Sequence, residues 1–186
     1  MNLDKAIHGR RAVREYTPDS VNEQTIHGLI DAAIQAPSAV NQQPWRFSVI
    51  RNQSLLDRIS HEAKIYMLAT TAPDQLSEQL LSHLRNPEFQ IFYHAPVLVV
   101  ISAASAGLWA VEDCALAAQN LMLTAFAAKL GSCWIGFAQK FLGTKVGKSL
   151  IECPSEWVPI APIIVGHPAS PAVPVPRKEP HIKWID

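Results

Sequence analysis

The stretch that decides the fold is Ala110–Leu130, AVEDCALAAQNLMLTAFAAKL. It contains no Gly or Pro and is rich in Ala and Leu, so it predicts one long helix that Gly131 ends. Even its polar side is interrupted by Leu116, Leu123 and Ala127, which predicts a helix with almost no face in water. The charged and amide side chains within the stretch make it a poor membrane span.

One flank of this expected helix carries mostly small side chains. They are Ala110, Cys114, Ala117, Ala118, Leu121, Ala125 and Ala128. Small side chains let a second helix approach closely. We therefore interpret the flank as a contact with a second subunit, and cover by the chain's own domain is the alternative.

The composition is that of one ordinary soluble domain. The chain has 186 residues, 48% hydrophobic and 17% charged, with zero net charge, so nothing calls for nucleic acid. It shows neither a signal peptide nor an apolar run of membrane-spanning length. Cys114, Cys133 and Cys153 lack disulfide parity and metal spacing. We predict one cytoplasmic domain over residues 1–186, without membrane or metal, in which residues 170–186 form an extended proline-containing arm.

Shorter periodic segments surround the long helix. Three apolar runs of strand length are Trp45–Ile50, Val97–Ala103 and Ile160–Val165, and Ser132–Phe137 reads as a short strand or turn. The other expected helices are a short first one capped by Asp4 and interrupted by Gly9, one from Asn22 to about Gln35, one from Gln53 to about Met67, and one at Phe141–Leu150. Residues 70–90 are expected to be helical in part. These elements predict an α+β fold.

Several familiar motifs are absent. The segment Gly143–Ser149, GTKVGKS, has three residues between its glycines where a phosphate-binding P-loop needs four, so a solvated loop is the better interpretation. No G-x-G-x-x-G supports a Rossmann site and no G-x-S-x-G supports a serine hydrolase. His61-Glu62 is not followed by the second histidine of a zinc motif.

Two polar stretches remain as candidate sites. Arg10, Arg11 and Arg14 could form a surface patch, yet guanidinium groups also suit a phosphate because their planar forks give bidentate, charge-assisted bonds. The segment Pro37–Trp45 could be a polar turn, yet its three amide side chains between prolines carry donors and acceptors that match a uracil-like ring edge. Together the two stretches indicate a phosphorylated heterocycle as ligand. Arg177 and Lys178 in the tail could add charge at its phosphate end.

Six pieces of the chain, in order, resemble the nitroreductase family of FMN-dependent oxidoreductases. They are RRAVREY (10–16), APSAVNQQPWRF (36–47), FYHAPVLVVIS (92–102), EDCALAAQNLMLTAFAAKLGSCWIG (112–136), VGHP (165–168) and PRKEP (176–180). The resemblance implies an α-β-α sandwich with a central mixed, largely antiparallel sheet. It also implies an intertwined homodimer with one tightly bound FMN in each of two interface sites.

The resemblance assigns roles to particular residues. The FMN phosphate and part of its ring would be held by Arg10, Arg11, Ala12 and Arg14, with Arg177 and Lys178 completing the phosphate site. The other subunit would supply Pro37, Ser38, Asn41 and Gln43, and the reactive ring nitrogen would lie beside Ile135 and Gly136. Ala12 stands where many members have Ser. The chain also lacks a longer helical insertion, so Tyr66, Phe89, Phe92 and Trp109 are the candidates to cover the flavin.

The implied activity is hydride transfer from NADH or NADPH to FMN, followed by reduction of a nitroaromatic, quinone or similar small acceptor in a ping-pong sequence. No protein residue is expected to act as catalyst, because the cofactor carries the chemistry. A flavin-dependent dehydrogenase, dehalogenase or flavin-fragmenting enzyme on the same scaffold is the alternative, as is a flavin-binding module without catalysis. An interaction domain without any cofactor is the remaining possibility.

Overall fold

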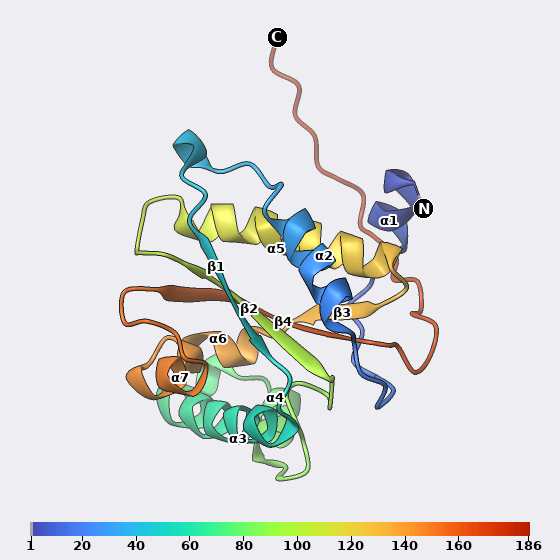
Figure 1. Ribbon diagram of the computed structural model, residues 1–186. Coiled ribbons are helices and arrows are strands. Elements are labelled where there is room, and N and C mark those ends of the chain that lie inside the picture. The colour runs from blue at the N-terminus through green and yellow to red at the C-terminus, as the bar shows by residue number, and fades with distance from the viewer. Residues whose placement is uncertain (1) are drawn as a thin grey trace.

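The computed structural model describes residues 2–186, and its frame is a four-stranded sheet (Figure 1). The strands lie in the order β1 (Trp45–Ile50), β2 (Val97–Ala103), β4 (Val158–Gly166), β3 (Gly131–Trp134), each antiparallel to its neighbour. The expected α+β fold is confirmed. The sheet is antiparallel in all three ladders, and within residues 2–186 parallel pairing is limited to an isolated bridge between Ala12 and Ser132.

Helices cover both faces of this sheet (Figure 1). On one face lie α2 (Glu23–Ala33) and α5 (Ala110–Ala127), with α1 (Leu3–Gly9) beside the end of α5. On the other lie α3 (Gln53–Thr70), α4 (Glu78–Arg85), α6 (Gly136–Leu142) and α7 (Lys145–Leu150). Each face has its own apolar core, and β2 is buried at every residue because its run VLVVISA contacts both. Two 3₁₀ turns, Ala39–Asn41 and Pro73–Gln75, complete the elements.

Helix α5 corrects two expectations. It ends at Ala127 rather than continuing to Gly131, because Lys129 adopts a left-handed backbone with φ of 62° and turns the chain into β3. Its small flank is not open to a second subunit: Cys114, Ala117 and Ala118 are wholly buried in a core that α2 and the sheet of the same chain complete. The alternative, cover by the chain's own domain, is what the structure shows. No helix among residues 2–186 is long and apolar enough to cross a membrane.

Other boundaries also differ from expectation. Asn2 caps α1 in place of Asp4, and its side chain accepts from the Lys5 amide. The segment expected as one helix at 141–150 is the end of α6 and all of α7, separated at Gly143, and Thr144 caps α7. The GTKVGKS segment is therefore largely helical rather than a solvated loop. Residues 70–90 contain α4 and one 3₁₀ turn, as expected of a partly helical segment.

Gly131 serves close packing rather than helix termination. The chain after α1 runs beside β3, where Ala12 bridges Ser132 and the Val13 amide donates to the Ser132 carbonyl oxygen at 3.1 Å. A Cβ on Gly131 would lie 2.8 Å from Val13 Cβ, closer than side chains normally approach. Gly131 thus lets the arginine-bearing segment lie directly against the sheet edge.

A matched pair of glycine substitutions tests this packing. Gly131→Ala should lower the free energy of unfolding by about 1–3 kcal/mol, because Val13 must move away from β3. A Cβ added at Gly28 in α2 has no atom within 4 Å. Gly28→Ala should therefore raise the free energy of unfolding by about 0.5–1 kcal/mol, because alanine has the higher helix propensity. Urea unfolding of both variants measures the two effects, and equal behaviour would show that the close approach at Gly131 is unimportant.

Candidate functional site

Guanidinium groups from both ends of the chain line one cavity. Arg10, Arg11, Arg14 and Arg177 all border a space of about 440 Å³, together with Glu15 as its one acidic residue. The first three come from the segment beside β3, and Arg177 comes from the C-terminal arm, which has no regular secondary structure. Four cations against one carboxylate make this cavity suited to an anion. Lys178 does not line it.

Glu15 fixes the start of the arm. Its backbone carbonyl accepts from the Ala169 amide at 3.0 Å, and its carboxylate accepts from the Ser170 hydroxyl at 3.1 Å. These bonds hold the first arm residues beside the arginine segment. Glu15 therefore engages the arm with the same carboxylate that partly offsets the charge of the arginines.

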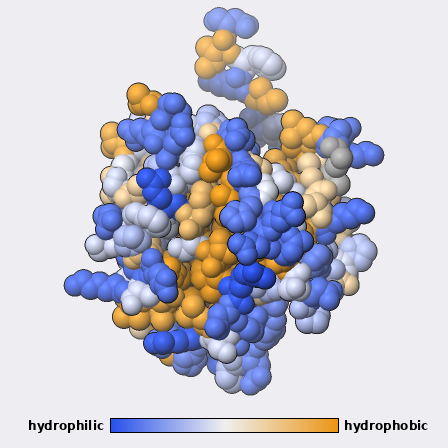
Figure 2. All heavy atoms as spheres, viewed as in Figure 1, coloured by the Kyte–Doolittle hydropathy of each residue, from blue (hydrophilic) through white to orange (hydrophobic). Residues whose placement is uncertain are grey.

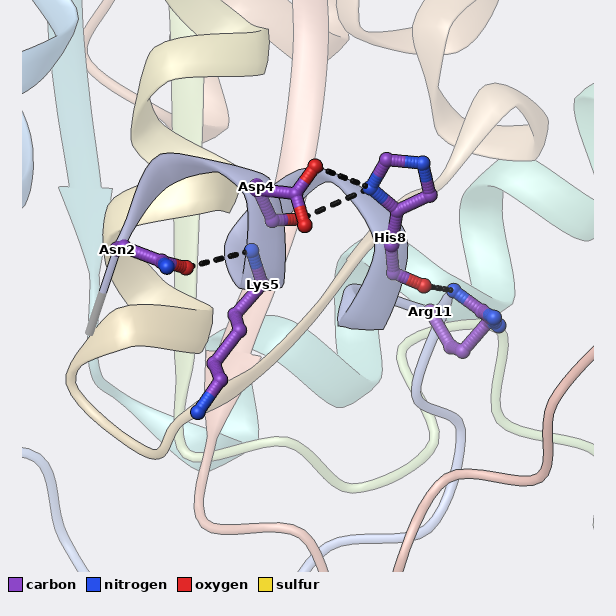
Figure 3. Close-up of polar contacts among 5 residues, drawn as sticks. All are labelled: Asn2, Asp4, Lys5, His8 and Arg11. Carbon is purple, nitrogen blue, oxygen red and sulfur yellow. Dashed lines mark hydrogen bonds and ion pairs between the residues drawn. The ribbon is translucent and has the colours of Figure 1, made fainter.

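Two nitrogens of the Arg11 guanidinium lie in different surroundings. Its Nη1 donates to the carbonyl oxygens of His8 at 2.6 Å and Arg10 at 2.8 Å, so the guanidinium caps the C-terminus of α1 (Figure 3). Its Nε is buried and has no hydrogen-bond partner among residues 2–186, and the same holds for the Ser132 hydroxyl. Both residues line an adjoining cavity of about 550 Å³, which shares Arg10, Arg11, Val13 and the start of the arm (170–172) with the first. Two buried polar groups without partners, next to clustered cations, fit the oxygens of a bound phosphate.

The amide loop is ordered by its own side chains. Ser38 Oγ accepts from the Gln43 amide at 2.9 Å, and Gln43 Nε2 donates to Asn41 Oδ1 at 2.9 Å. Val40, Asn41 and Gln43 hold left-handed backbones with φ of 50°, 55° and 48°. Such conformations cost energy outside glycine and tend to persist where function needs a fixed geometry.

Asp113 ties this loop to α5. Its Oδ1 accepts from the Ala39 amide at 2.9 Å, and the residue is only 3% exposed, with Oδ2 lacking a partner in the described chain. Sequence reasoning did not select Asp113. The available signal was a carboxylate beside Ala110, Cys114 and Ala117, which share a buried flank of the helix.

The loop and the arginines lie at opposite ends of α5. Asp113 sits in the first turn, whereas Phe126 near the last turn lines the cavity beside Arg10 and Arg11. Residues 113 and 126 are separated by about 20 Å at about 1.5 Å per residue. In Figure 1, the turn before β1 likewise lies near one end of α5 and α1 lies near the other. One protomer therefore does not bring both groups to a single ligand.

Ile135 and Gly136 stand at the far end of β3 from the arginine cavity. The Ile135 amide donates to the Pro162 carbonyl oxygen at 2.8 Å, so this N–H is already used. Gly136 is exposed and begins α6, and the first amides of a helix have no partner within it. Of the two, Gly136 is the one whose amide has no backbone acceptor within the described residues. It also lines a separate cavity of about 550 Å³.

The arginine-bearing segment runs along β3 from the arginine cavity towards Gly136. Ala12 pairs with Ser132 in parallel, so Arg14 lies further along the direction that leads to Gly136. The Arg14 guanidinium lies 6.0 Å from the centre of the Tyr93 ring. Burial raises the pKa of Tyr93, and the nearby Arg14 opposes that rise. Tyr93 was not singled out in the sequence, and only its spatial proximity to Arg14 reveals it.

The aromatic candidates for a cover are scattered. Phe92 is wholly buried in the core, and Phe89 packs edge-to-face on Tyr93 and on His83. Trp109 is 54% exposed at the start of α5. Tyr66 alone of the four borders the cavity next to Gly136.

The cysteines offer no nucleophile. All three are buried and unpaired. Burial raises the pKa of the Cys114 thiol to about 12, and burial also raises those of Cys133 and Cys153. Thiols with raised pKa values stay protonated and unreactive near neutral pH. Within residues 2–186, no three His, Cys, Asp or Glu side chains gather where they could hold a metal ion.

Comparison with known proteins gives this arrangement a context. The nitroreductase family model matches residues 7–167 of the chain. A Methanothermobacter thermautotrophicus protein, provisionally named NADH dehydrogenase/NAD(P)H nitroreductase, is 29% identical over 174 residues, covering 91% of this chain and 78% of that protein.

Solved structures share the fold. A nitroreductase with bound FMN from Desulfitobacterium hafniense matches with a TM-score of 0.84 and 21% identity over the full length of both chains. Oxidized iodotyrosine deiodinase, bound to FMN and 3-iodo-L-tyrosine, matches with a TM-score of 0.76 and 21% identity, again over both full lengths. At these identities the likeness describes the fold alone, and one fold can carry several reactions.

The Asp113 tether can be tested by hydrogen exchange. Asp113→Ala removes the acceptor of the Ala39 amide, so that amide should exchange about tenfold faster. Asp113→Asn keeps an oxygen in that place and should stay close to the wild type. NMR-detected exchange of the Ala39 amide measures both, and unchanged protection in the alanine variant would show that the carboxylate does not hold the loop.

Proposed function

Since the chain belongs to the nitroreductase family, we propose that it is an FMN-dependent oxidoreductase that takes hydride from NADH or NADPH and reduces small organic acceptors. With a nitroaromatic acceptor, NAD(P)H, one proton and the nitro compound give NAD(P)⁺, the nitroso compound and water. With a quinone, the same donor and one proton give the hydroquinone. Both overall reactions transfer two electrons.

The arginine cavity is the observation that carries this proposal. Arg10, Arg14 and Arg177 offer guanidinium groups to a phosphate, and the unpartnered Arg11 Nε and Ser132 hydroxyl offer further donors. β3 then leads from this cationic end to the free amide of Gly136. An elongated ligand with an anionic tail and a ring, such as FMN, matches that order of groups.

The residues of the chain would bind the cofactor and orient its ring. The guanidinium groups fix the phosphate, and Gly136 offers an N–H to the ring edge. FMN, when bound, supplies acceptance and return of a hydride equivalent. No acid, base or thiol of the chain is required, which agrees with the inert, buried cysteines. Donor and acceptor would use the same open side in turn, so we expect ping-pong kinetics.

We further propose a homodimer with FMN at the interface. The amide loop and the arginine cavity lie at opposite ends of α5, so a loop from a second copy has to complete the ring site. The C-terminal arm projects from the body (Figure 1) and carries hydrophobic residues into solvent (Figure 2). Trp184 and Ile185 are 83% and 84% exposed, while Val111 and Leu116 of α5 are 57% and 45% exposed. Apolar surfaces of this kind are typical of a protein that associates with another copy.

The function is tested by the absorption of the purified protein. A flavin spectrum that bleaches on anaerobic addition of NADH or NADPH and returns on addition of a nitroaromatic or quinone supports the proposal. A flavin that neither donor reduces would favour another reaction on the scaffold. A colourless protein that FMN does not reconstitute would contradict flavin binding altogether.

Two arginine substitutions test the phosphate site. Arg10→Ala should weaken FMN binding by about 10- to 100-fold, because one charge-assisted contact is lost, and adding Arg14→Glu should empty the site. Arg58→Ala on the exposed side of α3 is the matched control. Fluorescence titration of FMN measures the affinities. A double variant that retains full FMN occupancy would refute these roles.

The arm is tested through assembly. Trp184→Ser with Ile185→Ser should raise the dimer dissociation constant by at least about tenfold, since two large apolar contacts are removed. Lys183→Gln is the control on the same arm. Sedimentation velocity over a dilution series gives the constants. A wild-type protein that binds FMN fully as a monomer would overturn the proposed interface.

A further inference from the structure

The cavity beside Gly136 is separate from the arginine cavities and has no role so far. It has a volume of about 550 Å³ and lies between the end of α3, the segment from the 3₁₀ turn into the start of α4, and α6. We propose that this cavity binds the electron acceptor and that it selects a flat aromatic molecule carrying an acidic group. The inference rests on the proposed oxidoreductase function and names its substrate class.

The walls suit a flat ring. The large apolar and aromatic side chains of the lining are Tyr66, Met67, Leu76, Leu80 and Phe137. A volume in the range of about 300–1,000 Å³ with apolar walls and a few polar groups is typical of small-molecule sites. The cavity is therefore large enough for a substituted benzene or naphthalene ring.

One charge stands among the lining residues. Lys140 is the sole ionisable cation of the lining, and no aspartate or glutamate accompanies it. The ion pairs found within residues 2–186 involve His8 and His27, so no carboxylate of the described chain neutralises Lys140. An ammonium group on a residue that lines an apolar cavity, with no carboxylate beside it, favours a carboxylate, sulfonate or phenolate on the ligand and disfavours a cation.

The position fits an acceptor. Gly136 belongs both to this cavity and to the place assigned to the reactive ring edge. A molecule held here would lie next to the source of electrons. Gln75 and Gln139 add amides that can bond a nitro or carbonyl oxygen while the acid group faces Lys140.

The nicotinamide donor is the other anionic aromatic molecule of the reaction. Its two or more phosphate groups would need several cations, and this cavity offers only Lys140. A small acid with a single charge matches one ammonium group. We therefore assign Lys140 to the acceptor and not to the donor.

The experiment compares 4-nitrobenzoate with methyl 4-nitrobenzoate, which differ in charge at one substituent. The measured quantity is the ratio of their kcat/KM values in the wild type, Lys140→Gln and Lys140→Glu. The ratio should fall about threefold in the glutamine variant and further in the glutamate variant. The wild-type ratio should also fall as salt rises, because screening weakens the attraction. Lys145→Gln, at an exposed lysine outside the cavity, should keep the wild-type ratio.

Two results would overturn the assignment. A ratio that is the same in all three proteins contradicts a role for Lys140 in selecting acids. An increase in KM for NADH or NADPH in Lys140→Gln, at an unchanged ratio, assigns the lysine to the donor instead. Flavin bleaching by the donor is recorded first, so failure of the proposed function is seen separately, as a flavin that neither donor reduces.

Discussion

The candidate site depends on the close approach of the arginine segment to β3. The Val13 amide bonds the Ser132 carbonyl oxygen, and only a glycine at 131 leaves room for Val13. This contact sets the register of Arg10, Arg11 and Arg14 along the sheet edge. Glu15, two residues beyond Val13, then holds the start of the arm that carries Arg177. One backbone pairing thus organises cations from both ends of a chain of 186 residues.

The length of α5 is the second constraint. A helix of 18 residues keeps its two ends apart, and here one end holds the amide loop and the other borders the arginine cavity. The small side chains on one flank of α5 let α2 and the sheet pack closely against the helix. The flank thus stabilises the protomer, and the apolar residues left exposed are larger ones such as Val111 and Leu116.

The sequence predicted best what local periodicity controls. The bounds of β1 and β2 match expectation because their apolar runs are bordered by turn residues, and Asn22 caps α2 as its side chain chemistry suggests. The sequence-based prediction was wrong where the backbone conformation of one residue sets the end of a helix. Lys129, with its left-handed backbone, ends α5 earlier than expected. The sequence could not reveal the partner of Arg14, since Tyr93 is distant in sequence, nor the Asp113 tether, which bonds residues 74 positions apart.

The loop holds Val40 in a backbone conformation that is unfavourable for valine. A β-branched residue in a left-handed conformation is unfavourable, and at 89% exposure its methyl groups gain nothing from burial. The bonds of Ser38, Gln43 and Asp113 supply the compensation within one chain. Any molecule that covers Val40 would further stabilise the same conformation. By linkage, a molecule that covers that face and the order of the loop would stabilise each other, in addition to what the bonds of the single chain supply.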